Sequence, residues 1–215
     1  MVRLIIMISL GLVGLGAIFV ARPTVETASA MVLMARDIFF PSEDNVKKGT
    51  SVASTSSPAK AAPLSDFAAK FGNNLMIMDD EKPKSFEATR LAGVKYYAFY
   101  YSASWCAPCR AFTPDLVRFY RTFKPSHPEF ELIFVNLDRS ENDMLSYMNS
   151  DSMQWPAIWY ADIDNPEIEA KKYCGEGIPC LVLVDDRGRV LSDTYVNGQY
   201  TDPHHVIDDI RAVMP

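Results

Sequence analysis

The sequence predicts an α/β domain in which a central mixed β-sheet is flanked by helices on both faces. Three observations lead to this prediction. Apolar runs of strand length recur along the chain, amphipathic segments lie between them, and a tight turn joins the last two runs. Alternating strands and helices favour parallel neighbours, whereas a closing hairpin adds an antiparallel pair. The mixture of apolar and polar residues that is typical of a folded domain extends from Leu64 to Pro215, the length of a single domain.

Strands are expected where apolar and aromatic residues follow one another without interruption. The run 95–102, KYYAFYYS, and the run 130–137, FELIFVNL, are typical of central strands. A tight turn at 185–188, Asp-Asp-Arg-Gly, makes a hairpin of the last two runs. The expected strands are 75–78, 95–102, 130–137, 180–184 and 189–195.

Helices are expected between these strands. In segment 108–123 the apolar residues Phe112 and Leu116 recur at helical spacing. Segment 140–149 begins with Ser140, a residue type that caps helix N-termini. The expected helices are 108–123, 140–149, 167–173 and 202–213.

The charge balance argues against nucleic acid as a partner. The chain carries 21 Lys and Arg residues against 27 Asp and Glu residues, a net charge of −6 at pH 7. Binding to phosphate groups requires clustered cations, and the sequence has no basic stripe with interleaved aromatic residues. The 48% hydrophobic content is enough for a packed core.

The N-terminus is predicted to be a targeting or anchoring segment. Residues 4–20 carry no charge and follow Arg3, so residues 1–30 are expected to be a cleaved signal peptide or an N-terminal membrane anchor. Ala28-Ser29-Ala30 has the form of a cleavage site, and a buried soluble helix is a third alternative. The first two interpretations predict an extracytoplasmic location, periplasmic or in the cell envelope. They add a membrane contact through residues 4–20 if the segment is retained.

Residues 31–63 are expected to form a flexible linker. The stretch 51–63, SVASTSSPAKAAP, is small, polar and interrupted by proline, with no periodic apolar pattern. Such a stretch buries too little apolar surface to offset the entropy of ordering it. The predicted organisation is therefore 1–30, 31–63 and a globular domain at 64–215.

The chemistry is predicted to reside in Trp105-Cys106-Ala107-Pro108-Cys109, which follows a strand and opens a helix. Cysteines three apart at a helix start can close a disulfide, with the first thiol exposed beyond the helix end. The helix dipole lowers the pKa of a thiol at this end and so favours the nucleophilic thiolate. Pro108 fits the first turn, where an N–H has no helical partner. We expect Cys106 to be the nucleophile and Cys109 to resolve the mixed disulfide.

The cysteine pair allows two other interpretations. Half of a zinc site would need two further ligands, and neither Cys174 and Cys180 nor the three histidines have a ligand-like spacing. A purely structural disulfide across so short a loop would constrain the unfolded chain little. Redox chemistry is the favoured interpretation, and no metal or cofactor is expected.

Gly177-Ile178-Pro179 is the second signal and stands just before a predicted strand. A proline at a strand start is tolerated where its missing N–H is not needed. By sequence alone, an X–Pro bond is usually trans, and without Cys106 and Cys109 a simple strand-entry proline would be the default interpretation.

Five motifs in order resemble the thioredoxin-like superfamily, and more narrowly its nucleoredoxin and tryparedoxin group, over roughly residues 64–215. They are YAFYYSASWC at 97–106, RAFTP at 110–114, FELIFVNLDR at 130–139, MQWP at 153–156 and GIP at 177–179. The resemblance implies the thioredoxin fold and a disulfide reductase. It also implies that Ile178 and a cis Pro179 align the substrate backbone, and that Trp155 lies near the substrate face.

Two features depart from that group. Its known members are largely cytosolic, whereas this chain has an export-like segment. The position six before the first cysteine is acidic in many thioredoxins and is Tyr100 here, which leaves the base that assists Cys109 unassigned.

Further residues have open roles. Trp105 is expected to contact substrate, as aromatic residues often do at interfaces. Cys174 and Cys180 are a candidate second thiol pair, for which a structural disulfide, two idle thiols and a redox role all remain open.

The predicted function is therefore a thiol–disulfide oxidoreductase that reduces protein disulfides outside the cytoplasm through its Cys-Ala-Pro-Cys pair. Its expected partners are disulfide-containing proteins and a thiol electron donor. The alternatives are a redox-silent binding or chaperone module of the same fold and a net thiol oxidant.

Overall fold

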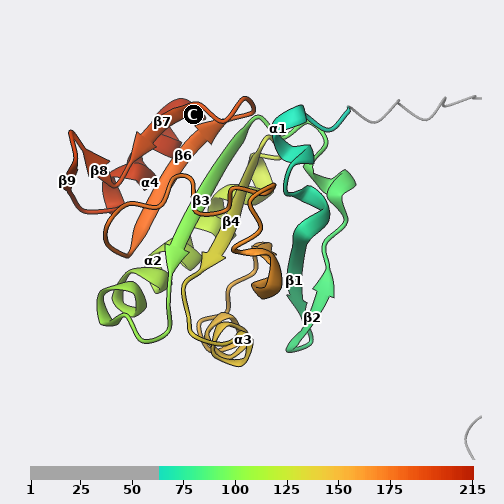
Figure 1. Cartoon of the computed structure of the whole chain (residues 1–215). Coiled ribbons are helices and arrows are strands. Elements are labelled where there is room, and N and C mark those ends of the chain that lie inside the picture. The colour runs from blue at the N-terminus through green and yellow to red at the C-terminus, as the bar shows by residue number, and fades with distance from the viewer. Residues whose placement is uncertain (1–62) are drawn as a thin grey trace, which may run out of the picture. The chain divides into compact units, whose positions relative to one another are not determined.

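The computed structural model describes residues 63–215 (Figure 1). Their centre is a seven-stranded mixed sheet with the order β2-β1-β5-β4-β3-β6-β7, and β8 and β9 form a separate two-stranded hairpin. The strands are β1 Leu75–Asp79, β2 Lys82–Ser85, β3 Tyr96–Ser102, β4 Phe130–Asn136, β5 Ala157–Ile158, β6 Cys180–Asp185, β7 Val190–Asp193, β8 Tyr195–Val196 and β9 Gln199–Tyr200. The α-helices are α1 Asp66–Ala69, α2 Ala107–Phe123, α3 Glu141–Ser150 and α4 His204–Val213. The 3₁₀ turns are η1 Gly72–Asn74, η2 Ala88–Leu91, η3 Lys124–Ser126 and η4 Tyr160–Asp162.

Strand β3 lies inside the sheet, where it runs parallel to β4 and antiparallel to β6. Its alternating side chains divide the core between the two faces of the sheet, as strand geometry requires. Ala98 and Tyr100 pack with residues of α2, α3 and α4. Phe99 and Tyr101 face the other way and pack with residues of α1, η2 and the segment 163–174. The mixed α/β fold with a central sheet is confirmed.

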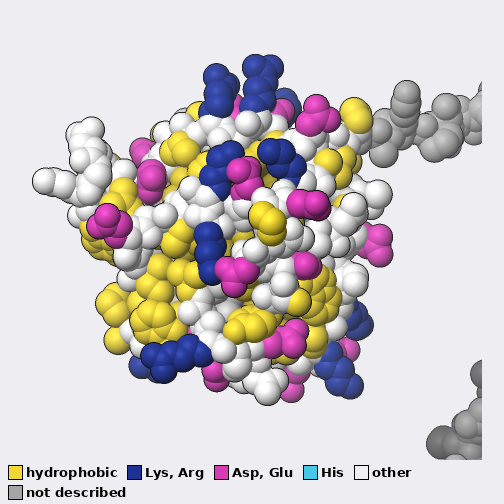
Figure 2. All heavy atoms as spheres, viewed as in Figure 1, with side chains coloured by type: hydrophobic (Ala, Val, Ile, Leu, Met, Phe, Trp, Pro, Cys, Tyr) yellow, Lys and Arg dark blue, Asp and Glu magenta, His cyan; other side chains and the backbone are white. Residues whose placement is uncertain are grey.

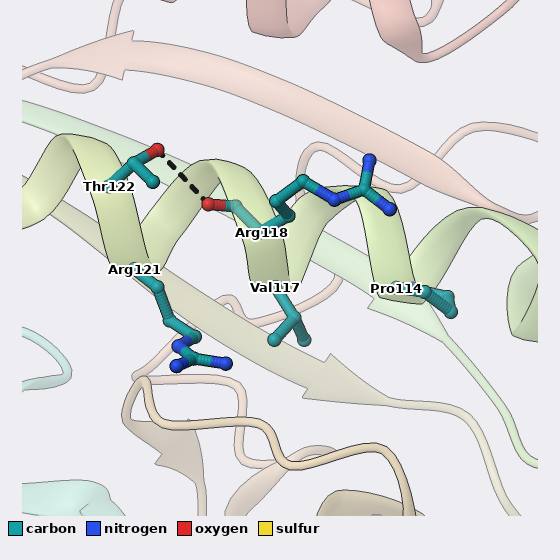
Figure 3. Close-up of a pocket in the computed structure, with 5 residues that line it drawn as sticks. All are labelled: Pro114, Val117, Arg118, Arg121 and Thr122. Atoms are coloured by element: carbon teal, nitrogen blue, oxygen red, sulfur yellow. Dashed lines mark hydrogen bonds between the residues drawn. The ribbon is translucent and has the colours of Figure 1, made fainter.

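Helix α2 carries the cysteine pair at its start. Its N-cap, its first-turn proline and the spacing of its apolar residues explain why this segment is helical. Cys106 is its N-cap and Pro108 lies in its first turn. Buried residues such as Phe112 and Leu116 recur along its inner face. Its outer face carries a shallow pocket, lined by Pro114, Val117, Arg118, Arg121 and Thr122 (Figure 3).

Most predicted elements are present, with small shifts at their ends. The helix expected at 167–173 is wrong, because the structure has turns there and Glu169 takes a left-handed backbone conformation with φ 52°. A residue with positive φ interrupts an α-helix. The strand expected at 189–195 is broken at Thr194, which separates β7 from β8. Strands β2 and β5 were not predicted, because β2 is polar and contains Pro83, and β5 has only two residues.

The predicted segments 1–30 and 31–63 fall almost wholly outside the described residues, so both remain predictions. Within residues 63–215, none of the helices combines the length and apolar character that crossing a bilayer requires.

Candidate active site

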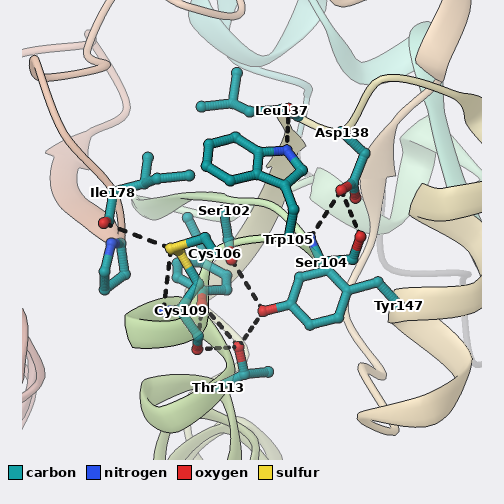
Figure 4. Close-up of a disulfide and its surroundings, with 12 residues drawn as sticks. Ser102, Ser104, Trp105, Cys106, Cys109, Thr113, Leu137, Asp138, Tyr147 and Ile178 are labelled. Carbon is teal, nitrogen blue, oxygen red and sulfur yellow. Dashed lines mark hydrogen bonds between the residues drawn. A yellow bond between two sulfur atoms is a disulfide. The ribbon is translucent and has the colours of Figure 1, made fainter.

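The cysteine pair lies between β3 and α2, at the carboxyl end of β3 (Figure 4). Cys106 and Cys109 form a disulfide with a Cα–Cα distance of 5.2 Å. The backbone N–H of Cys109 lies 3.2 Å from Cys106 Sγ and donates to it. In the reduced protein, this N–H and the positive end of the α2 dipole would both stabilise a Cys106 thiolate.

Cys106 is less accessible than its position at the helix end suggested. The residue is only 5% exposed and Cys109 is fully buried. Ala103, Leu137 and Ile178 pack around the two cysteines. The expectation of an openly exposed first thiol is wrong, because the loops after β4 and before β6 cover the sulfur from two sides.

The turn before β6 approaches the disulfide directly. The Ile178–Pro179 peptide bond is cis. The carbonyl oxygen of Ile178 lies 3.6 Å from Cys106 Sγ. The turn at 177–179, which is distant in sequence from the cysteine pair, thus lies beside Cys106 with a backbone carbonyl facing the sulfur.

The two tryptophans singled out from the sequence differ sharply. Trp105 is 59% exposed, and its indole N–H donates to the Leu137 carbonyl at 3.3 Å. Trp155 is fully buried, edge-on to Tyr100 and Tyr120. The expectation that Trp155 contacts substrate is wrong. Its position beside a short central strand places the indole under α2, in the core.

Hydroxyl groups fill the space behind Cys109. Thr113 Oγ1 donates to the Cys109 carbonyl at 2.9 Å and lies 2.8 Å from the Tyr100 hydroxyl and 2.6 Å from the Tyr147 hydroxyl. The Tyr147 hydroxyl is 3.0 Å from Ser102 Oγ. Burial raises the pKa of Tyr100 well above its ordinary value, so this side chain is neutral. Tyr100, which stands at the position that is acidic in many thioredoxins, is thus part of a hydroxyl network with Thr113 and Tyr147.

Asp138 is a site residue that sequence reasoning missed. One of its oxygens accepts from the Ser104 backbone N–H at 2.8 Å and from the Ser104 hydroxyl at 2.7 Å. Its other oxygen is buried without a hydrogen-bond partner among the described residues. Burial raises the pKa of this carboxyl, although the Ser104 hydrogen bonds lower it. The sequence feature that could have identified Asp138 is its position just after β4, because the loop that carries Trp105 follows the neighbouring parallel strand β3.

Cys174 and Cys180 are both free, so the structural disulfide considered for them is absent. Cys180 begins β6 beside Pro179 and is fully buried, and this burial raises its thiol pKa to about 12. Cys174 is half-buried, and burial likewise raises its pKa. Both thiols are therefore protonated near neutral pH, which is the condition of weakly nucleophilic thiols.

Comparisons with known proteins agree with this geometry. The family model described as Thioredoxin-like matches residues 93–190. Nucleoredoxin from Mus musculus is 38% identical over 51% of this chain and 24% of its own length. Probable nucleoredoxin 1 from Arabidopsis thaliana is 35% identical over 47% of this chain and 17% of its own length. Tryparedoxin I from Leishmania major is 31% identical, with a TM-score of 0.51, over 69% of this chain and 95% of that one.

The fold and the cysteine pair together define the thioredoxin-like class of thiol–disulfide oxidoreductases. Within that class, the chain belongs to the nucleoredoxin- and tryparedoxin-like group. It aligns with only about a quarter of the length of the mouse nucleoredoxin, whereas it covers almost all of the tryparedoxin.

These relatives correct one prediction. The extracytoplasmic location expected from residues 4–20 is wrong, because the relatives are nucleoredoxins from mouse, human and Arabidopsis thaliana, a largely cytosolic group. The expectation depended on the apolar character of one short segment, and that segment lies outside the described residues. The apolar character of a segment does not by itself specify the cellular location of a protein.

Proposed function

We propose that this protein reduces disulfide bonds in proteins, with Cys106 as the nucleophile and Cys109 as the resolving cysteine. The observation that carries the proposal is the Cys106–Cys109 disulfide at the start of α2, where the Cys109 N–H meets Cys106 Sγ at 3.2 Å. A thiolate is stabilised at such a helix start, so Cys106 is the better nucleophile of the two. Cys109 is fully buried and meets a substrate only through Cys106.

The reaction transfers two electrons from the cysteine pair to the substrate. The Cys106 thiolate attacks one sulfur of the substrate disulfide, forming a mixed disulfide and releasing the first substrate thiolate. The Cys109 thiolate then attacks Cys106 Sγ, releasing the second substrate thiolate and closing the Cys106–Cys109 disulfide. The two thiol protons of the reduced pair balance the two substrate thiols. A dithiol electron donor reduces the enzyme again by the same exchange in reverse.

Two surface features support a polypeptide as substrate. Trp105 is exposed beside Cys106 and offers a flat aromatic contact. The carbonyl of Ile178 lies near Cys106 Sγ and can accept a hydrogen bond from an extended substrate chain. Figure 2 shows apolar side chains gathered at the lower left of the view, where β3 ends and α2 begins in Figure 1. We propose Trp105, Ile178 and Pro179 as the substrate-contacting residues.

The test is to trap the intermediate. The whole chain with Cys109→Ser, once reduced, should accumulate a mixed disulfide with insulin, visible as a mass increase that dithiothreitol removes. Cys106→Ser should form no such adduct, and Cys174→Ser is the matched control that should reduce insulin like the unsubstituted protein. Absence of the adduct in Cys109→Ser would indicate a redox-silent binding module and contradict the proposal.

The direction of electron flow is tested by the reduction potential of the pair. Equilibration with dithiothreitol should give a value near or below about −250 mV, as in thioredoxin, whereas a value near about −120 mV is that of a strong oxidant. The latter value would replace reduction by net thiol oxidation.

A further inference from the structure

A short hairpin stands beside the redox site. Strands β8 and β9 are joined by Asn197 and Gly198, with φ 53° and 76°. Two successive left-handed residues are what a type I′ turn requires, and Asn-Gly is its preferred sequence. The turn places Tyr195 directly opposite Tyr200, with ring centroids 5.5 Å apart in an edge-to-face arrangement. Cross-strand partners point to the same face, so the hairpin presents two tyrosines together.

Tyr200 reaches the turn that faces the disulfide. Its hydroxyl donates to the carbonyl of Pro179 at 3.1 Å. The carbonyl of the preceding residue, Ile178, is the one that lies 3.6 Å from Cys106 Sγ. The Tyr200 ring is 48% exposed, so the side chain contributes little to the core. A single hydrogen bond therefore connects an exposed tyrosine to the backbone beside the nucleophile.

Tyr195 packs on the same turn from its other end. A Cβ atom at Gly175 would overlap the Tyr195 ring, and one at Gly177 would lie 3.0 Å from the Tyr195 hydroxyl oxygen. The two glycines therefore allow the ring to lie against the backbone leading into Ile178.

The base of the hairpin is fixed to the first residues of β6. Thr194 Oγ1 accepts from the Leu181 N–H at 2.8 Å and donates to the Leu181 carbonyl at 2.9 Å. The Thr194 carbonyl in turn accepts from the Thr201 N–H at 2.9 Å. Both ends of the hairpin thus connect to the same short stretch of chain, through Pro179 and through Leu181.

The surface beside the hairpin is open to a polypeptide. One hollow of about 520 Å³ has Pro108, Phe112 and Pro179 in its lining, and another of about 420 Å³ has Ile178 and Gly177. Tyr200 lines both hollows. A chain lying along the turn would therefore pass over this side chain.

We propose that the β8–β9 hairpin is a positioning element for disulfide exchange, in which Tyr200 holds the Pro179 carbonyl and Tyr195 holds Gly175 and Gly177. The proposal rests on the proposed function, because it concerns the same reaction at Cys106. The two tyrosines act through the turn: they keep the Ile178 carbonyl beside the sulfur and aligned with an incoming substrate backbone. A loosened turn weakens the binding of a polypeptide and leaves the exchange at sulfur unchanged.

The experiment compares the whole chain carrying Tyr200→Phe with the unsubstituted protein on two substrates. Removing one hydroxyl should raise KM for insulin by about three- to tenfold with kcat nearly unchanged, the size expected for one lost hydrogen bond. The second-order rate with the small disulfide 5,5′-dithiobis(2-nitrobenzoate) should stay within about twofold, because this substrate has no peptide backbone to align. Gly175→Ala, which displaces the Tyr195 ring, should likewise raise KM for insulin and leave the rate with the small disulfide nearly unchanged.

Tyr173→Phe is the matched control. The Tyr173 hydroxyl also donates to a backbone carbonyl, that of Gly188 at 2.8 Å, but at the end of β6 away from Pro179. This variant should match the unsubstituted protein on both substrates. The positioning role would be overturned if Tyr200→Phe lost activity with both substrates, or if it lost activity with neither substrate. If the unsubstituted protein itself fails to reduce insulin, the proposed function fails instead.

Discussion

The Tyr147 hydroxyl in α3 lies 2.6 Å from the Thr113 hydroxyl in α2, and this hydrogen bond joins the two helices behind the redox disulfide. Thr113 has one hydroxyl proton, which goes to the Cys109 carbonyl. The Tyr100 and Tyr147 hydroxyls both lie within hydrogen-bond distance of Thr113 Oγ1. Each also has a second partner: Tyr100 donates to the Cys109 carbonyl at 3.5 Å, and the Tyr147 hydroxyl lies 3.0 Å from Ser102 Oγ. Thr113 is therefore the residue that the hydroxyl groups behind the disulfide share.

Thr113→Val should destabilise the protein by about 1–3 kcal/mol, because it removes the hydrogen-bond partner that two buried tyrosine hydroxyls share. Urea denaturation of the oxidised protein measures the free energy of unfolding. Thr122→Val is the matched control on the same helix. Its hydroxyl bonds the Arg118 carbonyl on the outer face, and its loss should change stability by less than about 0.5 kcal/mol. Equal effects of the two substitutions would contradict the network.

Trp155→Ala and Trp105→Ala should separate stability from activity. The first removes a fully buried side chain and should cost about 3–5 kcal/mol of unfolding free energy. The second removes an exposed ring and should cost less than about 0.5 kcal/mol. Trp105→Ala should nevertheless lower kcat/KM with insulin, whereas folded Trp155→Ala should retain it. The reverse pattern would restore Trp155 as a substrate contact.

His204 should make stability depend on pH. Its ring nitrogens lie 3.1 Å from Asp115 and 2.6 Å from Asp202. Desolvation lowers the His204 pKa, but hydrogen bonds to the two carboxylates outweigh it, so the pKa is raised above 6.5. The His204 hydrogen bonds lower the pKa of both carboxyls below 3.8.

The signs of these shifts define a pH window. A raised histidine pKa stabilises the fold fully below about pH 6.5, and this contribution is lost as pH rises through the folded pKa. A lowered carboxyl pKa stabilises the fold above about pH 3.8 and is lost as pH falls. His204→Gln should therefore lose up to about 1 kcal/mol at about pH 5.5 and nearly nothing at about pH 8.5, since the groups are partly exposed. Urea denaturation at both pH values, with Asp115→Asn to complete a double-mutant cycle, tests this; a loss independent of pH would contradict it.

How much of the site the sequence predicted depends on the range of the interactions involved. Cys106, Cys109 and Pro108 were found from their spacing at a strand-to-helix junction, because capping and helix dipoles act within one turn. The core strands were found for a similar reason, since continuous apolar runs have few alternatives to burial. Trp155 and the segment 167–173 were misjudged, because burial of an indole and a left-handed Glu169 depend on neighbours distant in sequence.

The hairpin at Asn197-Gly198 was not predicted, and neither were the contacts of its two tyrosines. By itself the sequence determined the place of the cysteine pair at a helix start, most of the strand and helix pattern and the family resemblance, because each is encoded in residue type at short spacing. Only the tertiary structure decided which groups meet that pair: Ile178 beside Cys106, Thr113 beneath Cys109 and Tyr200 on Pro179. These contacts join residues that come together only when the sheet and its helices pack, so no local pattern specifies them.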